Sequence, residues 1–117
     1  MKFLLIILSL LASLSARDAH YEDEVDHLLK YVQTTECSYI RNGTSYNGEE
    51  AREHIEKKYD YFKDDIESVE DFIRLSATKS LIFGSKYYIA CPHKPKVESS
   101  QWLLSELHRY RKEENLK

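Results

Sequence analysis

The sequence predicts a small α+β domain, with about four helices packed on a small antiparallel β-sheet and one disulfide. Three observations support this fold class. Apolar residues recur at helical spacing in four segments, an Asn-Gly pair follows a short segment rich in β-forming residues, and the chain has two cysteines. Because neither an internal repeat nor a linker interrupts this pattern, we expect one domain.

The first sixteen residues have the pattern of a secretory signal peptide. One lysine precedes an apolar run that begins at Phe3 and reaches Ala12, and small residues follow. The run is too short to cross a bilayer, which takes about twenty apolar residues. We expect cleavage after Ala16, so residues 1–16 are the signal peptide and residues 17–117 form a single secreted domain without stable membrane insertion. An uncleaved signal anchor is the alternative.

Four amphipathic helices are predicted. The first covers residues 18–33. The second follows Asn47, which stands three residues before Glu50, the spacing of a capping box. A third follows the cap Ser68 and continues to Lys79. The last helix begins after two capping serines and is expected to fray after Arg111. The two capping serines are Ser99 and Ser100. The apolar residues on the faces of the four helices are Tyr21, Val25, Leu28, Leu29, Val32, Ala51, Ile55, Tyr59, Phe62, Val69, Phe72, Ile73, Ala77, Leu103, Leu104, Leu107 and Tyr110.

Short strands are predicted between these helices. Residues 37–42 form a strand that stops at Asn42-Gly43, a pair typical of a tight hairpin turn, and residues 44–46 can return as a second strand. Gly84-Ser85 separates "SLIF" from residues 86–91, which predicts either a hairpin or a loop that leads into a strand. Pro92 ends that strand, because proline has no N–H to donate to a neighbouring strand.

Cys37 and Cys91 are predicted to form a disulfide, because export places them in an oxidising compartment. Their strands would place them near one end of an antiparallel pair. A free thiol pair and a redox centre are the alternatives. A redox centre is disfavoured because the two residues are far apart and no Cys-x-x-Cys occurs.

Composition and motifs exclude several classes of function. The chain has 17 Lys and Arg against 20 Asp and Glu, a net charge of −3, so no basic face for nucleic acid is expected. The five histidines lack the spacing of a zinc helix. No Gly-x-Ser-x-Gly, phosphate loop or dinucleotide fingerprint occurs, and no cofactor is expected.

Nine tyrosines in so short a chain suggest either an interface or the rim of a small core, and the core rim is favoured. Tyr87 and Tyr88 are neighbours on a predicted strand, so one should face the core and the other outward. An outward tyrosine beside Tyr39 would suit a partner-binding surface.

The candidate functional residues lie around the first hairpin and the helix after it. On that helix His54 shares a face with Glu50 and Lys58, and it would act as a general base or bind an anion beside Arg41. The alternatives are that His54 bonds a turn carbonyl, that Glu50 serves the helix cap, and that Arg41 pairs with a helix glutamate. The six predicted binding residues are Arg41, Asn42, Tyr46, Glu50, His54 and Lys58.

Four segments together resemble the YfeK-like family of small bacterial envelope proteins. They are "YIRNGTSYNGEEAREHIEKKYDY", "VEDFIRLSATKS", "GSKYYIAC" and "SSQWLLSELHRYR", and they cover nearly all of the predicted mature chain. Where the family has Ser-Gly-x-Pro-Tyr, this chain has residues 83–87, "FGSKY", so the turn there can differ. The resemblance implies a location in a Gram-negative periplasm. It implies no activity and no catalytic residue.

These observations lead to two hypotheses about function. The first is a periplasmic binding or interaction module without catalysis, which contacts a protein partner or a small ligand in the cell envelope. The second is a small hydrolase or transferase that uses His54 as its general base.

Overall fold

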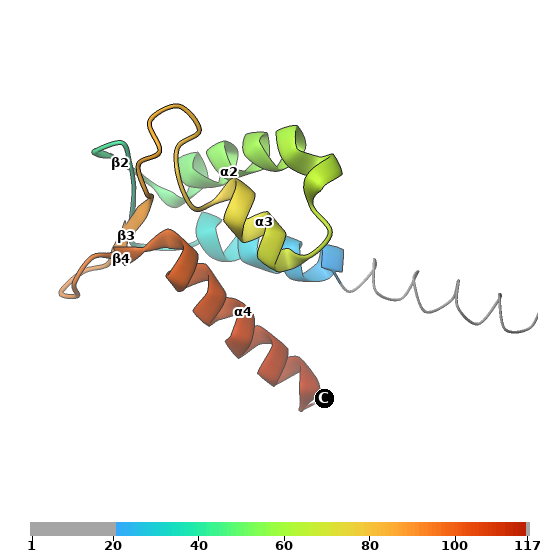
Figure 1. The fold of residues 1–117 in the computed structure, drawn as a ribbon. Helices are drawn as coiled ribbons and strands as arrows, with labels where there is room; N and C mark the ends of the chain where they lie inside the picture. Colours follow the sequence, from blue (N-terminus) through green and yellow to red (C-terminus); the bar gives the residue numbers. More distant parts are fainter. Residues whose placement is uncertain (1–20, 117) are drawn as a thin grey trace, which may run out of the picture.

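The structure is a computed structural model that describes residues 21–116 (Figure 1). The predicted signal peptide and its cleavage point lie outside these residues. Within the described residues, none of the helices combines the length and the apolar character that crossing a membrane requires.

The α+β fold with four helices, an antiparallel sheet and one disulfide is confirmed. Residues 21–33 form the first helix, which is called the N-terminal helix below. The remaining elements, in chain order, are β1 (Ser38–Arg41), β2 (Thr44–Tyr46), α2 (Gly48–Phe62), the short 3-10 helix η1 (Lys63–Asp65), α3 (Val69–Ser76), β3 (Tyr88–Ala90), β4 (Val97–Glu98) and α4 (Ser99–Asn115).

The sheet has the strand order β2-β1-β3-β4, and each neighbouring pair is antiparallel. Asn42 and Gly43 join β1 to β2 with φ angles of 51° and 76°, which are the left-handed values that this type of hairpin turn requires. Strand β4 was not predicted. Two residues are too few to show a strand pattern in a sequence.

The predicted disulfide is present between Cys37 and Cys91. Cys37 precedes β1 and Cys91 follows β3, and the adjacent residues Ser38 and Ala90 are paired across the two strands. The Cα atoms of the cysteines are 4.3 Å apart. The bond therefore closes the end of the central strand pair.

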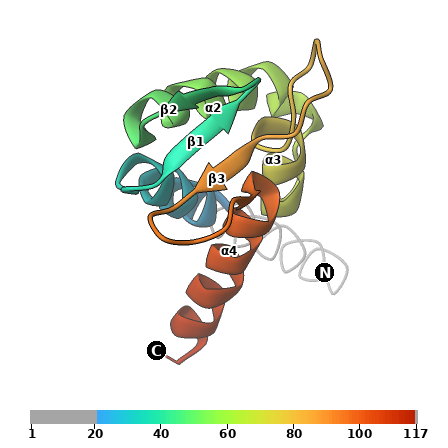
Figure 2. The same cartoon turned by 90° about the vertical axis from the view of Figure 1, so that its left-hand side faces the viewer.

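The core lies between the sheet and the helices, and Figure 2 shows the sheet in front of them. Tyr87 is buried and Tyr88 is half-buried, as the alternation along a strand predicts. The buried apolar side chains are Val25, Leu28, Leu29, Val32, Tyr39, Ala51, Ile55, Val69, Phe72, Ile73, Ala77, Tyr87, Ile89, Leu103 and Leu107.

Tyr39 corrects one interpretation of the tyrosines. It is 1% exposed, so it cannot belong to a partner-binding surface. Its hydroxyl donates to the carbonyl of Ala77 and accepts from the hydroxyl of Ser99, at 3.5 and 3.2 Å. These bonds satisfy a polar group that would otherwise be costly to bury.

Two helix boundaries also differ from the prediction. Helix α3 ends at Ser76 rather than Lys79, and the Thr78 hydroxyl donates to the carbonyl of Ile73. Helix α4 starts without a side-chain cap, because its Ser99 is buried against Tyr39. Its helical residues continue to Asn115, beyond Arg111, where fraying is predicted.

Candidate functional site

Strand β1 and helix α2 bring three of the six predicted residues together. Arg41 ends β1, Tyr46 ends β2, and His54 lies near the middle of α2. The Asn47 side chain accepts from the Glu50 N–H at 2.9 Å, and the Glu50 carboxylate accepts from the Asn47 N–H at 3.1 Å. This capping box fixes where α2 begins, and therefore which residue of α2 faces the hairpin.

Arg41 and His54 are in direct contact. The Nη1 atom of Arg41 lies 3.2 Å from Nδ1 and 3.2 Å from Nε2 of the His54 ring. A guanidinium group can only donate hydrogen bonds, so it needs a ring nitrogen that carries no proton. The contact therefore fits a neutral His54 and not a protonated one.

Tyr46 completes the cluster. Its ring meets the His54 ring edge-on, with centroids 5.0 Å apart, and the Arg41 guanidinium lies 5.9 Å from the Tyr46 centroid. The latter distance is within the range of a cation–π attraction. We call Arg41, Tyr46 and His54 the hairpin cluster.

The pKa of His54 lies below its ordinary value. Partial burial disfavours the charged ring, and the positive charges of Arg41 and Lys57 lower the pKa further, against the opposing effect of Glu53 and Glu50. The uncharged form of the His54 ring is therefore favoured, which suits the hydrogen bond from Arg41.

Arg41 differs from the other arginines of the described residues. Within residues 21–116 it forms no ion pair, whereas each of the other four arginines contacts a carboxylate. The predicted alternative, a pair between Arg41 and a helix glutamate, is therefore not what the structure contains. The four paired arginines are Arg52, Arg74, Arg109 and Arg111.

The other three predicted residues have separate structural tasks. Asn42 is exposed in the hairpin turn, and Glu50 is engaged in the capping box. Lys58 points to the loop before β3, where its ammonium donates to the carbonyl of Lys79 at 2.5 Å and to the hydroxyl of Tyr87 at 3.2 Å. The hydrogen bonds described for these three residues do not involve Arg41, Tyr46 or His54.

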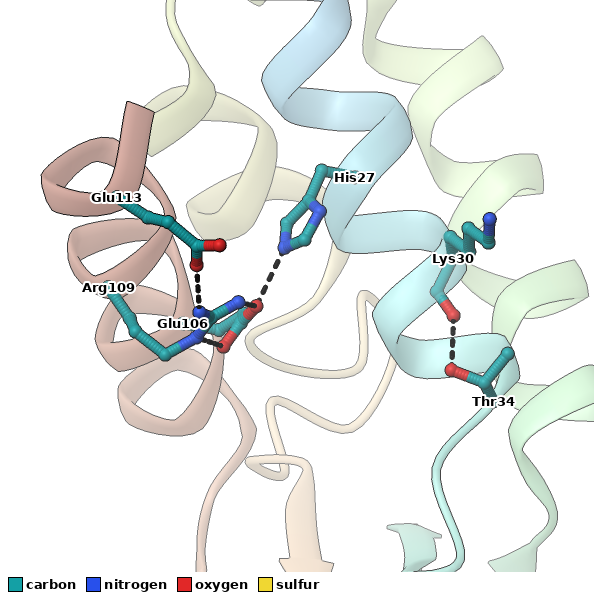
Figure 3. Close-up of polar contacts among 6 residues, drawn as sticks. All are labelled: His27, Lys30, Thr34, Glu106, Arg109 and Glu113. Carbon is teal, nitrogen blue, oxygen red and sulfur yellow. Dashed lines mark hydrogen bonds and ion pairs between the residues drawn. The ribbon is translucent and has the colours of Figure 1, made fainter. Parts of the chain in front are cut away.

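A second polar cluster was not predicted. Glu106 of α4 is 5% exposed, and its carboxylate accepts two hydrogen bonds from Arg109, at 2.8 and 2.7 Å (Figure 3). The Nε2 atom of His27 lies 2.6 Å from the same carboxylate, and the His27 ring stacks on Tyr110 at 3.9 Å. The bonds from Arg109 and His27 lower the pKa of Glu106.

A third polar cluster, around Arg111, links α4 to the N-terminal helix and to α3. Arg111 donates to the buried carboxylate of Glu24 at 2.6 and 3.0 Å and to Glu70 at 2.9 Å. It thereby connects the N-terminal helix, α3 and α4. The sequence did contain one indication of these two clusters. Glu24 and Glu106 fall on the apolar faces of their helices, where a carboxylate needs a buried partner.

His27, Glu106 and Arg109 also border an open hollow of about 560 Å³, with Lys30, Tyr31 and Thr34. The hydroxyl of Thr34 donates to the carbonyl of Lys30, and the buried carboxylate is already bound by Arg109 and His27 (Figure 3). This arrangement holds two helices together.

A model of DUF5329, a family of unknown function, matches residues 19–111. The chain belongs to DUF5329. An uncharacterized protein of Salmonella typhimurium, YfeK, is 31% identical over 90 residues, which are 74% of this chain and 75% of that protein. The predicted resemblance to the YfeK-like family is therefore confirmed. No solved structure matches the chain.

The matched part of this DUF5329 chain contains all three clusters, and neither description names an activity. Within residues 21–116, no group of three or more His, Cys, Asp or Glu side chains is placed to hold a metal ion. A general base at His54 would need a ring nitrogen free to accept a substrate proton. Because Arg41 lies against both ring nitrogens, it would first have to move away.

Proposed function

We propose that this DUF5329 protein is a periplasmic binding module without catalytic activity, and that Arg41 binds an anionic group of a protein partner or small ligand. The anionic group is a carboxylate or a phosphate, both of which match the planar donor geometry of arginine. The observation that carries the proposal is that Arg41 has no carboxylate partner among residues 21–116.

His54 and Tyr46 support this assignment. A neutral imidazole accepts a hydrogen bond from Arg41 without cancelling its charge, so it positions the guanidinium for a further contact. The three residues of the hairpin cluster are half-buried. A charge in such a position is screened less by the solvent than a charge on an open surface. Lys57 adds further positive charge close to His54.

The periplasmic location rests on three features. The first sixteen residues have the signal-peptide pattern, the disulfide between Cys37 and Cys91 suits an oxidising compartment, and the family resemblance implies a Gram-negative envelope. Cell fractionation tests this part directly. Recovery of the chain in the cytoplasm with an intact signal sequence would contradict it.

The binding part is tested with two simple probes, inorganic phosphate and acetate. The protein without residues 1–16 is melted with increasing concentrations of each probe, beside sodium chloride at equal ionic strength. At least one probe should raise the melting temperature of the wild type but not of the Arg41→Gln variant. Arg52→Gln is the matched control, because Arg52 lies on the same helix as His54 and is already paired with Glu56.

Two results would overturn the proposal. One is that neither probe raises the melting temperature above the sodium chloride reference. The other is an equal rise in the wild type and in Arg41→Gln. A complementary experiment captures partners from a periplasmic extract, and the double variant Arg41→Ala, His54→Ala should lose what the wild type retains.

A further inference from the structure

Residues 80–85 form a tight loop between α3 and β3 that stands out from the body of the protein (Figure 2). Its backbone is held in place at the base. The Ser80 N–H donates to the Ser85 carbonyl at 2.9 Å, and the Gly84 N–H donates to the Ser80 carbonyl at 3.0 Å. Lys79 and Lys86 form a β-bridge below the loop. The loop therefore has a defined shape.

The tip of this loop consists of three apolar side chains in succession. Leu81, Ile82 and Phe83 are 62%, 85% and 73% exposed. Consecutive apolar residues of this size are expected to turn at least partly into a core, and here none does. Of the two predicted alternatives, a hairpin or a loop that leads into a strand, the structure has the loop, with a single bridge between Lys79 and Lys86.

Basic residues surround the tip. Leu81 lines one hollow together with Arg74 and Lys79, and Phe83 lines a second hollow together with Lys86 and Lys96. The described residues that line these two hollows include four cations and no Asp or Glu. By contrast, three glutamates line the hollow beside α2, namely Glu49, Glu53 and Glu56.

Two of these cations have partners and still face outward. Lys86 pairs with Glu98, and its side chain is 59% exposed; Arg74 pairs with Asp71 and is 64% exposed. Lys96 lies over the Tyr88 ring, 4.5 Å from its centroid. The long aliphatic parts of such side chains lie along apolar surface while their charged ends reach an aqueous or headgroup layer.

We propose that this loop docks the protein on an anionic phospholipid bilayer, with Leu81, Ile82 and Phe83 inserted among the acyl chains and the surrounding cations against the headgroups. Reversible membrane binding generally takes two contributions, an apolar insertion and an attraction to anionic lipid. The loop combines both. Its tip is convex and carries three neighbouring apolar residues, which suits insertion into a fluid layer.

The docking surface is separate from the hairpin cluster. Asn42 and Gly43 of the β1–β2 turn line the hollow beside Phe83, but none of the three cluster residues lines either hollow. Membrane binding also needs no anion at Arg41. The two proposals can therefore fail independently.

The test is sedimentation of the disulfide-bonded protein, without residues 1–16, with vesicles. One set contains phosphatidylglycerol mixed with phosphatidylcholine, and the other contains phosphatidylcholine alone. The wild type should bind the anionic vesicles, and added salt should weaken binding. The double variant Ile82→Ser, Phe83→Ser should reduce the vesicle partition coefficient by about tenfold or more, because both apolar side chains are lost from the acyl layer.

Matched controls separate this effect from general loss of apolar or basic surface. Leu116→Ser removes a side chain that is 85% exposed, as Ile82 is, but lies at the end of α4. It should leave binding unchanged. Lys79→Gln with Lys86→Gln should weaken binding, whereas Lys112→Gln on α4 should not. Melting curves establish that each variant is folded.

Insertion can also be measured at the tip itself. The Phe83→Trp variant should show a blue shift of its added fluorescence with anionic vesicles, and quenching by lipids brominated on their acyl chains.

The absence of vesicle binding by the wild type would overturn the proposal. Binding that is unaffected by Ile82→Ser, Phe83→Ser would also overturn it. The proposal would also be overturned if Ile82→Ser, Phe83→Ser lost binding to a captured protein partner but kept its binding to vesicles.

Discussion

Arg41 and His54 face each other between the end of β1 and the middle of α2, with Nη1 of Arg41 3.2 Å from both nitrogens of the His54 ring. An arginine beside a histidine is an unfavourable pair if both are charged. Here burial and the arginine keep the pKa of His54 below its ordinary value, so the histidine is neutral and accepts. The contact is therefore sensitive to pH.

Lowering the pH should destabilise the protein through His54. Its pKa is lower in the folded protein than the ordinary value of about 6.5 that the unfolded chain has. As the pH falls below about 6.5, the unfolded chain takes up the proton first, and the free energy of unfolding decreases until the folded-state pKa is passed. Urea denaturation over a pH series measures this slope.

The His54→Gln variant isolates this contribution from that of the carboxylates. Glutamine does not titrate, so the decrease below about pH 6.5 should be smaller in the variant than in the wild type. Identical pH dependence of the two proteins would mean that the pKa of His54 is the same in the folded and unfolded chains.

The buried carboxylate of Glu106 should contribute more to stability than its exposed neighbour Glu113. Glu106→Gln removes the charge that Arg109 and His27 share, and it should lower the free energy of unfolding by about 1–2 kcal/mol at pH 7. Because Arg109 is 56% exposed, solvent screening keeps the effect below that of a fully buried pair.

Glu113→Gln is the matched control, since Glu113 binds the same Arg109 but is 57% exposed. The loss of free energy of unfolding in Glu113→Gln should be about 0.5 kcal/mol or less.

The pKa of Glu106 is lowered in the folded protein, so the stabilisation that Glu106 provides is present above its unfolded pKa and is lost as the pH falls through its folded pKa. Equal losses in the two variants, measured by urea denaturation, would contradict this account.

Gly48 should not tolerate alanine, although alanine is the better helix former. A Cβ atom at this position would collide with the carbonyl oxygens of Val32 and Gln33, at the end of the N-terminal helix. Gly48→Ala should therefore lower the free energy of unfolding by about 1–3 kcal/mol, instead of the gain that helix propensity alone predicts. Ser105→Ala, at an exposed position of α4, should have almost no effect.

The disulfide should supply a large part of the total stability. It closes a loop with a sequence separation of 54, for which the chain-entropy model gives about 4 kcal/mol. The Cys37→Ser, Cys91→Ser variant should show a loss of this size by urea denaturation. Mass measurement after alkylation, with and without reductant, should reveal two thiols only after reduction. Alkylation of both without reductant would contradict the bond.

The features predicted from sequence were those set by neighbouring residues. Asn42-Gly43 specifies a hairpin turn, and Asn47 with Glu50 specifies a helix start, because each requires only a few adjacent residues. The pairing of Cys37 with Cys91 was predicted because the chain has two cysteines and a predicted signal peptide. The apolar stripes of the four helices likewise gave most of the core.

The features that were missed depend on partners far away in the sequence. Ser99 has the sequence context of a helix cap, but its hydroxyl donates a hydrogen bond to the hydroxyl of Tyr39, sixty residues earlier in the chain. Glu106 is separated from His27 by 79 residues, so its burial could be suspected from its helix face but its partner could not be named. The candidate site was predicted in part. His54 was expected beside Arg41 and contacts it, whereas Lys58, which spacing on α2 grouped with His54, bonds to Lys79 and Tyr87 instead.

The most direct test of the role assigned to Arg41 is an NMR titration of the His54 ring in the wild type and in Arg41→Gln, each with and without phosphate or acetate. In the wild type the pKa of His54 should start below its ordinary value and rise when an anion binds, because the anion offsets the charge of Arg41. In Arg41→Gln the starting pKa should be higher, and neither probe should raise it. A pKa that neither probe changes in the wild type, or that rises equally in both proteins, would contradict anion binding at Arg41.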